Sequence, residues 1–287
     1  MTSEKSVHLQ APAKINLGLL VLAKRSDGYH DIQTVFLALD WFDQISISPF
    51  SSISMTCSDP TLPTDERNLV MRAALLLAER CSISFGAAIH LEKNLPHGAG
   101  LGSGSSDAAA TLMGLTEFWS CEVSTEELLA IAAELGSDVP FFLDPRPAIG
   151  EGRGERLTYI DEISSGSDVV SELFLAVITP PLIVSTEEAY SLVRSRLDTE
   201  PASLGPILKG FVDGWQSGLS NDFEKPIFKR YPELNDIKQR LIDEGAMYSS
   251  LSGSGSAVFG LFESEEKATR ALDSSGYDGW VGSPINT

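Results

Sequence analysis

Glycine and serine fill the middle of residues 94–114, NLPHGAGLGSGSSDAAATLMG, and an alanine-rich run follows them directly. Such residues let backbone N–H groups approach a ligand closely, because little or no side chain is in the way. The first N–H groups of a helix have no partner within the helix, and the helix dipole makes that end positive. A glycine-rich turn that leads into a helix is therefore a site for anions, most often phosphate. The alternative, a flexible linker, does not explain its place between a strand and a helix.

The flanking segments predict the strand and the helix that such a site needs. Apolar residues alternate along FGAAIHLEKNL as they do on one face of a strand: Phe85, Ala87, Ile89 and Leu91. After the loop, the run that begins at Ala108 predicts a helix, with Ser105, Ser106 or Asp107 as its cap.

The loop fits none of three common phosphate-binding patterns. The P-loop pattern GxxxxGK requires a lysine, and no lysine follows these glycines. The dinucleotide pattern GxGxxG fails at its third glycine, where Ser103 or Ser105 stands. Protein-kinase loops require the same glycine spacing and are excluded with it. The sequence therefore predicts a phosphate site of another class.

Two polar positions outside the loop are candidates for chemistry. Lys14 and Asn16 stand two residues apart in the strand-like segment PAKIN, so their side chains point to the same face. A cation and an amide that project together from an apolar strand indicate a site, although a solvent-facing lysine on an edge strand is the alternative. Asp138 lies in ELGSDVPFFL, between the end of a helix and an apolar run. Taken alone, Asp138 is more simply a turn aspartate that bonds nearby backbone N–H groups.

Two further segments have the composition of ligand-facing loops. Tyr29 and His30 follow a turn in DGYHD, where the tyrosine ring can stack on a planar ligand and the histidine can hydrogen-bond to it. Packing of Tyr29 on a neighbouring strand is the alternative. The segment LSGSGSAVFG at residues 251–260 resembles the first loop, which favours a second ligand-facing turn over a bend where another backbone passes close.

The elements that position these residues are strands and helices without strict alternation, which predicts an α+β protein with two lobes. Strand patterns lie at residues 7–24, 32–49 (as one strand or two) and 172–180. Residues 248–262 are a short Gly/Ser loop that leads into a further strand. Helix patterns lie at residues 65–81, 124–136, 186–197, 221–232, 232–245 and 264–276. Ser124 with Glu127, and Ser185 with Glu188, have the spacing of a capping box. The polar stretch at residues 161–170 is a candidate connection, and the predicted lobes are residues 1–162 and 163–287.

Composition limits the possible partners and compartment. The chain has 287 residues, and its formal net charge of −19 argues against a general surface for nucleic acid or anionic membrane. Cys57, Cys81 and Cys121 form no CxxC pair, which favours free, mostly buried thiols in a reducing compartment over disulfides or zinc. The N-terminal segment lacks the apolar core of a secretory signal, and prolines interrupt the longest apolar stretch. We therefore expect a cytoplasmic protein.

The segments together resemble one family, the GHMP kinases. APAKINLGL, DGYHDIQT, LPHGAGLGSGSSDAA, GSDVPFF and LSGSGSAVFG occur in the family's order between about residue 11 and residue 262. The resemblance implies a two-lobed fold, with a ribosomal-protein-like N-terminal lobe and a ferredoxin-like α/β C-terminal lobe. It implies an ATP-dependent small-molecule kinase that uses Mg²⁺. PAKINL, DGYHD and GSDVPFF resemble a subgroup that phosphorylates the 2-hydroxyl of a cytidine diphosphate derivative in non-mevalonate isoprenoid biosynthesis.

The resemblance also assigns roles to residues. It implies that Asp138 is the catalytic base and that Lys14 lies beside it, keeps its carboxylate ionised and helps to neutralise charge near the acceptor. The residues that it places against ATP form the phosphate loop: Pro96, His97, Gly98, Ala99, Gly100, Leu101, Gly102, Ser103, Gly104, Ser105 and Ser106. The residues that it places against the substrate are Asn16, Tyr29, His30, Thr186 and Tyr190, with Tyr29 and His30 at the cytosine.

This chain departs from the family pattern inside the loop. Ala99 and Ser103 replace common glycines, and His97 stands where methionine is frequent. The loop keeps its backbone donors provided that neither Ala99 nor Ser103 needs a positive φ.

Several alternatives remain open at this level. A kinase of the same family that acts on another small alcohol has much the same motifs. A non-catalytic binding protein on a ribosomal-protein-like lobe is a third possibility, which the negative charge and the joint presence of Lys14 and Asp138 disfavour. The sequence does not identify the metal ligands, for which Ser105 and Ser106 are candidates. We expect a monomer or weak homodimer with small-molecule partners only.

Overall fold

The computed structural model describes residues 6–160, 173–193, 204 and 212–285. The chain divides into two compact units. The first consists of residues 1–13, 42–96 and 102–144, and the second of residues 14–41, 97–101 and 145–287. The predicted connection at 161–170 and the predicted boundary at 162 lie outside the described residues. That boundary therefore remains a prediction.

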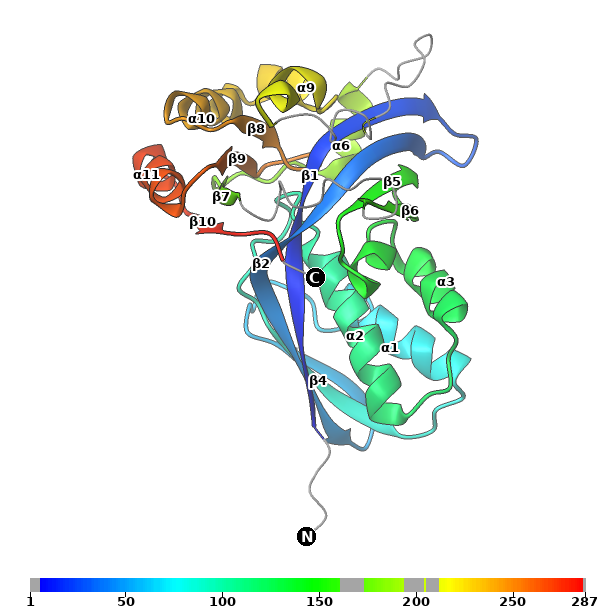
Figure 1. Ribbon diagram of the computed structural model, residues 1–287. Coiled ribbons are helices and arrows are strands. Elements are labelled where there is room, and N and C mark those ends of the chain that lie inside the picture. The colour runs from blue at the N-terminus through cyan, green and yellow to red at the C-terminus, as the bar shows by residue number, and fades with distance from the viewer. Residues whose placement is uncertain (1–5, 161–172, 194–203, 205–211, 286–287) are drawn as a thin grey trace. The chain divides into compact units, whose positions relative to one another are not determined.

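The elements alternate irregularly between strand and helix, as expected for the α+β class (Figure 1). The strands are β1 (Val7–Lys24), β2 (His30–Phe50), β3 (Ile53–Cys57), β4 (Gly86–Glu92), β5 (Ala148–Gly152), β6 (Arg156–Tyr159), β7 (Phe174–Ile178), β8 (Tyr248–Leu251), β9 (Val258–Phe262) and β10 (Gly279–Gly282). The helices are α1 (Leu69–Arg80), α2 (Ser103–Trp119), α3 (Thr125–Leu135), α6 (Thr186–Leu192), α8 (Trp215–Gly218), α9 (Glu224–Arg230), α10 (Pro232–Asp243) and α11 (Glu265–Ser275), with 3₁₀ turns η1 (Val139–Leu143) and η2 (Val212–Gly214).

The first unit places helices α1, α2 and α3 against one another beside strands β3 and β4 and the second half of β2 (Figure 1). Strand β4 pairs antiparallel with β2, from Gly86 opposite Phe50 to Glu92 opposite Gln44. Ala87, Ile89 and Leu91 are buried, as the alternation predicts. Phe85 is 55% exposed, contrary to the prediction, because β4 begins only at Gly86 and Phe85 precedes the pairing.

Local signals set the helix ends of this unit. Asn68 caps α1, its side chain accepting a hydrogen bond from the Val70 N–H at 3.0 Å. The predicted capping box of α3 is present in both directions between Ser124 and Glu127. Each cap satisfies backbone donors that the first turn of a helix leaves without partners.

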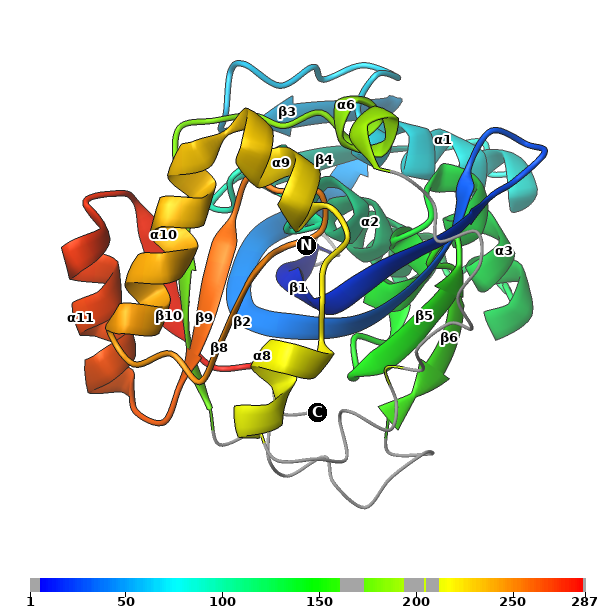
Figure 2. The ribbon, with the colours of Figure 1, turned by 90° about the horizontal axis from the view of Figure 1, so that it is seen from above.

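The second unit contains a four-stranded antiparallel sheet in the order β10-β7-β9-β8. Helices α10 and α11 pack on this sheet, as Figure 2 shows from above. The core between them is apolar and includes Ile178, Ile237, Val258, Phe262 and Ala271. Helix α6 ends at Leu192, and the rest of the helix predicted at 186–197 lies outside the described residues.

Two expectations about the chain's chemistry can be compared with the structure. Cys57, Cys81 and Cys121 are free, as expected, but each is only partly buried. Over the described ranges, no helix is both long and apolar enough to cross a membrane.

Candidate active site

The glycine loop has an alternating backbone conformation. Gly98, Gly100 and Gly102 have φ values of +70°, +79° and +70°. Ala99 and Ser103 are not among the residues with positive φ. Replacement of the family's glycines at these two positions is therefore compatible with the loop's backbone conformation. Alternation between left-handed and ordinary backbone turns successive N–H groups toward one side, which makes a concave site for anions.

The carbonyl groups of this loop are held by the second unit, to which residues 97–101 belong. The Ala99 oxygen accepts from the Ala257 N–H at 3.0 Å, and the Leu101 oxygen accepts from the Lys14 N–H at 2.9 Å. The Gly100 oxygen accepts from Ser252 Oγ at 2.9 Å and from Lys14 Nζ at 3.1 Å. In a trans peptide the N–H points opposite to the C=O. These bonds therefore turn the N–H groups of the next residues, 100, 101 and 102, away from the donors that hold the carbonyls.

The second glycine loop supports the first by close backbone contact. A Cβ on Gly100 would stand 2.1 Å from the Ser252 carbonyl oxygen, so no side chain fits there. Of the two interpretations of LSGSGSAVFG, the structure thus shows the bend where another backbone passes close. Whether this loop also faces a ligand stays a prediction.

Helix α2 begins at Ser103, earlier than predicted. Its N-cap is Gly102, which provides no side-chain bond to the first turn. The first helical bond runs from the Ser106 N–H to the Gly102 oxygen at 2.9 Å. The prediction of Ser105, Ser106 or Asp107 as the cap is wrong, because the left-handed glycine starts the helix and places all three inside it. A first turn without a side-chain cap can offer its N–H groups to an anion.

Lys14 and Asn16 meet, as their spacing predicts. Both are buried, and Lys14 Nζ donates to Asn16 Oδ1 at 2.6 Å. Asn16 Nδ2 in turn donates to Thr34 Oγ1 at 2.9 Å, and the Thr34 hydroxyl donates to the Gly18 oxygen at 2.7 Å. The alternative for Lys14, a solvent-facing lysine on an edge strand, is therefore excluded. Sequence inspection missed Thr34, because a threonine in an apolar strand has no distinguishing pattern.

Asp138 directly precedes η1 and is half-buried. Its side chain makes no capping hydrogen bond to η1. The simpler interpretation of Asp138, a turn aspartate that bonds nearby backbone N–H groups, is not tested by that single observation, and its role as the base stays a prediction.

His30, Tyr190 and Phe223 form an aromatic cluster. The rings of His30 and Tyr190 are stacked, with centroids 4.9 Å apart and planes inclined by 17°. The Phe223 ring meets the Tyr190 ring edge-on, with centroids 4.9 Å apart. Thr186 lies one helical turn before Tyr190 on α6 and is exposed. Burial, followed by the charge of Lys24, lowers the pKa of His30, which favours the neutral ring.

Tyr29 stands at the tip of a turn and is 56% exposed. The turn is closed by a bond from the Arg25 N–H to the Tyr29 oxygen at 2.8 Å, and Asp27 accepts from the Tyr29 N–H at 3.1 Å. The Arg153 guanidinium lies 5.1 Å from the centre of the Tyr29 ring, in cation–π range. Packing on a strand does not account for a tyrosine that is this exposed.

Comparisons with known proteins identify the family of this chain. Residues 68–144 match the GHMP kinases N terminal domain, and residues 204–277 match the GHMP kinases C terminal domain. A 4-diphosphocytidyl-2-C-methyl-D-erythritol kinase of Salinibacter ruber is 44% identical over 92% of this chain and 93% of its own. The chain belongs to the GHMP kinase family.

Solved structures place this GHMP kinase in the same fold. The crystal structure of a 4-(cytidine 5'-diphospho)-2C-methyl-D-erythritol kinase is 36% identical, with a TM-score of 0.82 over 98% of this chain and 100% of that one. A homoserine kinase from Cytophaga hutchinsonii has a TM-score of 0.77 over 99% of this chain and 96% of its own. At 20% identity that likeness shows the fold alone. This GHMP kinase is accordingly a small-molecule phosphotransferase, and the family implies ATP as its phosphate donor.

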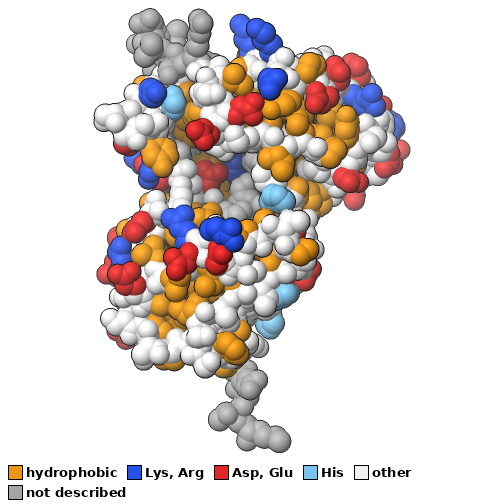
Figure 3. Space-filling view, turned by 180° about the vertical axis from the view of Figure 1, so that it is seen from behind, with side chains coloured by type: hydrophobic (Ala, Val, Ile, Leu, Met, Phe, Trp, Pro, Cys, Tyr) orange, Lys and Arg blue, Asp and Glu red, His pale blue; other side chains and the backbone are white. Residues whose placement is uncertain are grey.

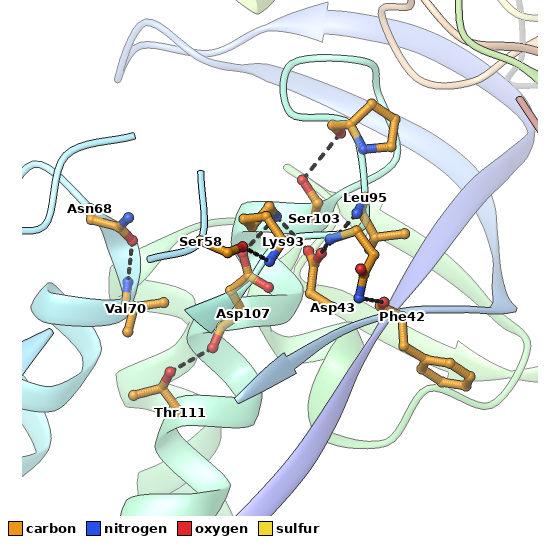
Figure 4. A network of polar contacts seen from close by, with 12 residues as sticks. Phe42, Asp43, Ser58, Asn68, Val70, Lys93, Leu95, Ser103, Asp107 and Thr111 are labelled. Carbon is orange, nitrogen blue, oxygen red and sulfur yellow. Dashed lines mark hydrogen bonds and ion pairs between the residues drawn. The ribbon is translucent and has the colours of Figure 1, made fainter. Parts of the chain in front are cut away.

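A buried ionic network in the first unit was not found from the sequence. Lys93 pairs with Asp43 and, at 3.0 Å, with Asp107 (Figure 4). Burial raises the pKa of Asp107 and Asp43 adds to the rise, against the opposing effect of Lys93. Burial acts to lower the pKa of Lys93, but Asp107 and Asp43 outweigh it and raise that pKa. The sequence offered one indication of this network, which is that Lys93 and Asp107 stand on either side of the glycine loop.

Acidic and basic side chains both lie on the surface of this GHMP kinase. On the face shown in Figure 3, acidic side chains lie singly or beside basic ones, so the net negative charge is dispersed there. Within the described ranges no group of three or more His, Cys, Asp or Glu residues is arranged to hold a metal ion.

Proposed function

We propose that this GHMP kinase transfers the γ-phosphoryl group of ATP to the 2-hydroxyl of 4-diphosphocytidyl-2-C-methyl-D-erythritol, in non-mevalonate isoprenoid precursor biosynthesis. The names of its relatives at 44% and 36% identity support this acceptor over another small alcohol. The same relatives argue against a non-catalytic binding protein.

One structural observation carries the ATP part of the proposal: the carbonyl groups of Ala99, Gly100 and Leu101 are all bound by protein donors. The following N–H groups are thereby held in fixed directions before any ligand arrives. Phosphoryl transfer requires mainly alignment and stabilisation of charge on the transferring group. Fixed N–H groups supply both without reorganisation during the reaction. We therefore assign the loop from Pro96 to Ser106 to the phosphates of ATP.

The proposed chemical roles fall on Asp138 and Lys14. Asp138 accepts the proton of the acceptor hydroxyl as attack proceeds, a role supported by the family motif GSDVPFF. Lys14 contributes positive charge and, through its bond to the Gly100 oxygen, helps to shape the loop.

The proposed substrate residues are Asn16, Tyr29, His30, Thr186 and Tyr190. Stacked rings favour a planar ligand such as cytosine, and base–aromatic stacking contributes about 1–3 kcal/mol for each base. A neutral His30 keeps one ring nitrogen as a hydrogen-bond acceptor and one as a donor. That combination suits the edge of a cytosine, which has both kinds of group.

Mg²⁺ is the proposed metal. It prefers oxygen ligands and usually binds through substrate phosphates together with one or two protein groups. Among the described residues, the Ser106 hydroxyl is buried without a hydrogen-bond partner in the first turn of α2, which fits this requirement. Ser106 would hold the ion with the phosphates, and Ser105 is the neighbouring candidate. When bound, the ion neutralises phosphate charge.

The remaining proposals concern the protein's setting. We place the enzyme in the cytoplasm, as a monomer or weak homodimer, with ATP and the cytidyl substrate as its partners and neither nucleic acid nor membrane among them. The formal net charge of −19 supports the absence of a general surface for nucleic acid or anionic membrane.

A coupled assay of ATP consumption tests the function. The panel contains the cytidyl substrate, homoserine, mevalonate and no acceptor, with wild-type protein and Asp138→Asn. The proposal expects that, of the acceptors in the panel, wild-type protein turns over only the cytidyl substrate. Asp138→Asn is expected to lose turnover and to keep its binding of ADP. Faster turnover with another alcohol would refute the acceptor, and near-normal turnover of Asp138→Asn would refute the base.

A further inference from the structure

Both ends of the glycine loop belong to the first unit, although residues 97–101 belong to the second. The chain leaves the first unit at Pro96 and returns at Gly102. The Ser103 hydroxyl donates to the Pro96 oxygen at 3.4 Å, a long hydrogen bond between the two ends. Such a weak contact does not by itself fix their separation.

Asp43 holds the entry to the loop. Its Oδ1 accepts from the Asn94 N–H at 2.6 Å and from the Leu95 N–H at 2.8 Å, and its Oδ2 pairs with Lys93. Asp43 has no exposed side-chain surface. A single buried carboxylate thus binds the three residues that lead from β4 to Pro96 (Figure 4).

Lys93 connects this entry to the exit. Its Nζ donates to Asp107 Oδ2 at 3.0 Å, and Asp107 lies just after the first turn of α2. The Thr111 hydroxyl donates to the Asp107 backbone oxygen at 2.7 Å, one turn further along. Through one ammonium group, the segment before the loop is joined to the helix after it.

Stability alone does not account for three ionisable side chains that are at most 4% exposed. Removing charges from water costs free energy, and well-packed apolar residues often replace a buried ion pair without loss of stability. Directional bonds from a charged centre do what apolar packing does not, because they fix both distance and orientation. The network of Asp43, Lys93 and Asp107 lies at the two ends of the glycine loop, where the distance between those ends affects the conformation of the loop.

We propose that Asp43, Lys93 and Asp107 form a clasp of positioning residues that holds the two ends of the phosphate loop at the separation its nucleotide-binding conformation requires. This inference rests on the proposed binding of ATP phosphates by the loop. The clasp acts through the loop backbone, so its loss affects the nucleotide and leaves the acceptor alcohol's affinity unchanged.

The test compares wild type with Lys93→Met and with Asp43→Asn, which keeps an acceptor for the two backbone N–H groups but loses the charge. Titration calorimetry measures the Kd for ADP, and steady-state kinetics separate the KM for ATP from the KM for the acceptor. All measurements are made well below the Tm of each variant, which is recorded. Glu134→Gln is the matched control, because it breaks the 2.8 Å pair with Arg80 on the exposed surface of the same unit.

The clasp predicts that Lys93→Met weakens ADP binding and raises the KM for ATP by about tenfold or more, with the acceptor KM within about twofold of wild type. Asp43→Asn is expected to raise the Kd for ADP and the KM for ATP as well, and Glu134→Gln is expected to leave both constants unchanged. A lower Tm with wild-type ADP affinity in the folded variants would show a purely structural network and overturn the proposal. If Lys93→Met does not fold, Asp43→Asn decides by the same criterion.

Failure of the function and failure of the clasp remain separable. If wild-type protein does not bind ADP, the proposed function fails. The clasp is then judged by hydrogen exchange of the amides in residues 97–102, which faster exchange in the folded variants supports and unchanged exchange refutes.

Discussion

The ammonium group of Lys14 donates a hydrogen bond to the carbonyl oxygen of Gly100 at 3.1 Å. A residue predicted to serve the reaction through its charge therefore also shapes the phosphate loop. With Ser252 on the same oxygen, it orients the peptide that presents the Leu101 N–H. Substitutions at Lys14 and in the loop should consequently share effects on nucleotide binding.

Gly100→Ala is expected to abolish the loop's conformation. The added Cβ would stand 2.1 Å from the Ser252 oxygen, which is backbone and cannot rotate away, and φ is +79°. Overpacking of this kind costs about 1–3 kcal/mol, so we expect a lower Tm and at least about tenfold weaker ADP binding. Gly276→Ala is the control, because φ is +74° there but the added atom meets open space. Equal effects of the two variants on ADP binding would contradict the role of the contact.

Lys14→Met removes a buried cation while keeping an extended side chain. Asn16 Oδ1 loses its charged donor, which costs about 1–3 kcal/mol for an acceptor left unsatisfied, and the Gly100 oxygen keeps only the bond from Ser252 Oγ. We expect kcat to fall by about a hundredfold or more, on the scale of losing one electrostatic contact at the reacting group. Lys229→Met, at an exposed position, is the control. A variant with normal kcat and normal Tm would exclude both roles of Lys14.

Acid should weaken binding of the cytidyl substrate through His30. Burial and then Lys24 lower its pKa in the folded protein, so the unfolded chain takes up the proton first as the pH falls. The stability this histidine contributes is complete above its unfolded pKa of about 6.5 and is lost as the pH falls through the lower folded value. The neutral ring therefore predominates at neutral pH, and protonation changes its acceptor nitrogen into a donor.

The measurement is the KM for the cytidyl substrate between about pH 5.5 and pH 8, with His30→Gln for comparison. We expect a KM that is flat near neutral pH and rises in acid for wild type, and no such rise for the variant. His90→Gln, outside the aromatic cluster, should keep the wild-type profile. The same acid rise in His30→Gln would assign the titration to another group.

Substitution of Tyr29 or Arg153 should raise the KM for the cytidyl substrate and leave the KM for ATP unchanged. Loss of one stacking contact in Tyr29→Ala should raise the KM for the cytidyl substrate by about tenfold or more. Arg153→Gln removes the cation from the ring, and an exposed cation–π contact of about 0.5–1 kcal/mol corresponds to a twofold to fivefold effect. Arg156→Gln, at an exposed position of β6, is the control. If Tyr29→Ala leaves the acceptor KM unchanged, a different acceptor is indicated.

Much of the local structure followed from the sequence because short-range chemistry determines it. The capping residues of α3 and the alternation along β4 depend on neighbours within a few positions. The side-by-side placement of Lys14 and Asn16 depends only on the period of a strand. The predicted start of α2 was wrong because two local signals compete there. Gly102, in the left-handed conformation, starts the helix before the three residues whose side chains are usual caps.

The parts that sequence inspection missed are long-range contacts of ordinary residues. Asp43 and Lys93 lie 50 positions apart, and nothing near either one indicates the other. Ser252 and Gly100 are separated by 152 positions, so only the fold reveals that one loop excludes a side chain from the other. Arg153 over Tyr29 is a third case, since it joins a hairpin turn to a distant loop.

Amide chemical shifts of protein labelled with ¹⁵N-glycine and ¹⁵N-leucine test the central claim most directly, because they report on the loop N–H groups themselves. The account predicts that ADP shifts the amides of Gly100, Leu101 and Gly102 most strongly, and that Gly276, outside the loop, does not move. Tight ADP binding that leaves those three amides unchanged would contradict it.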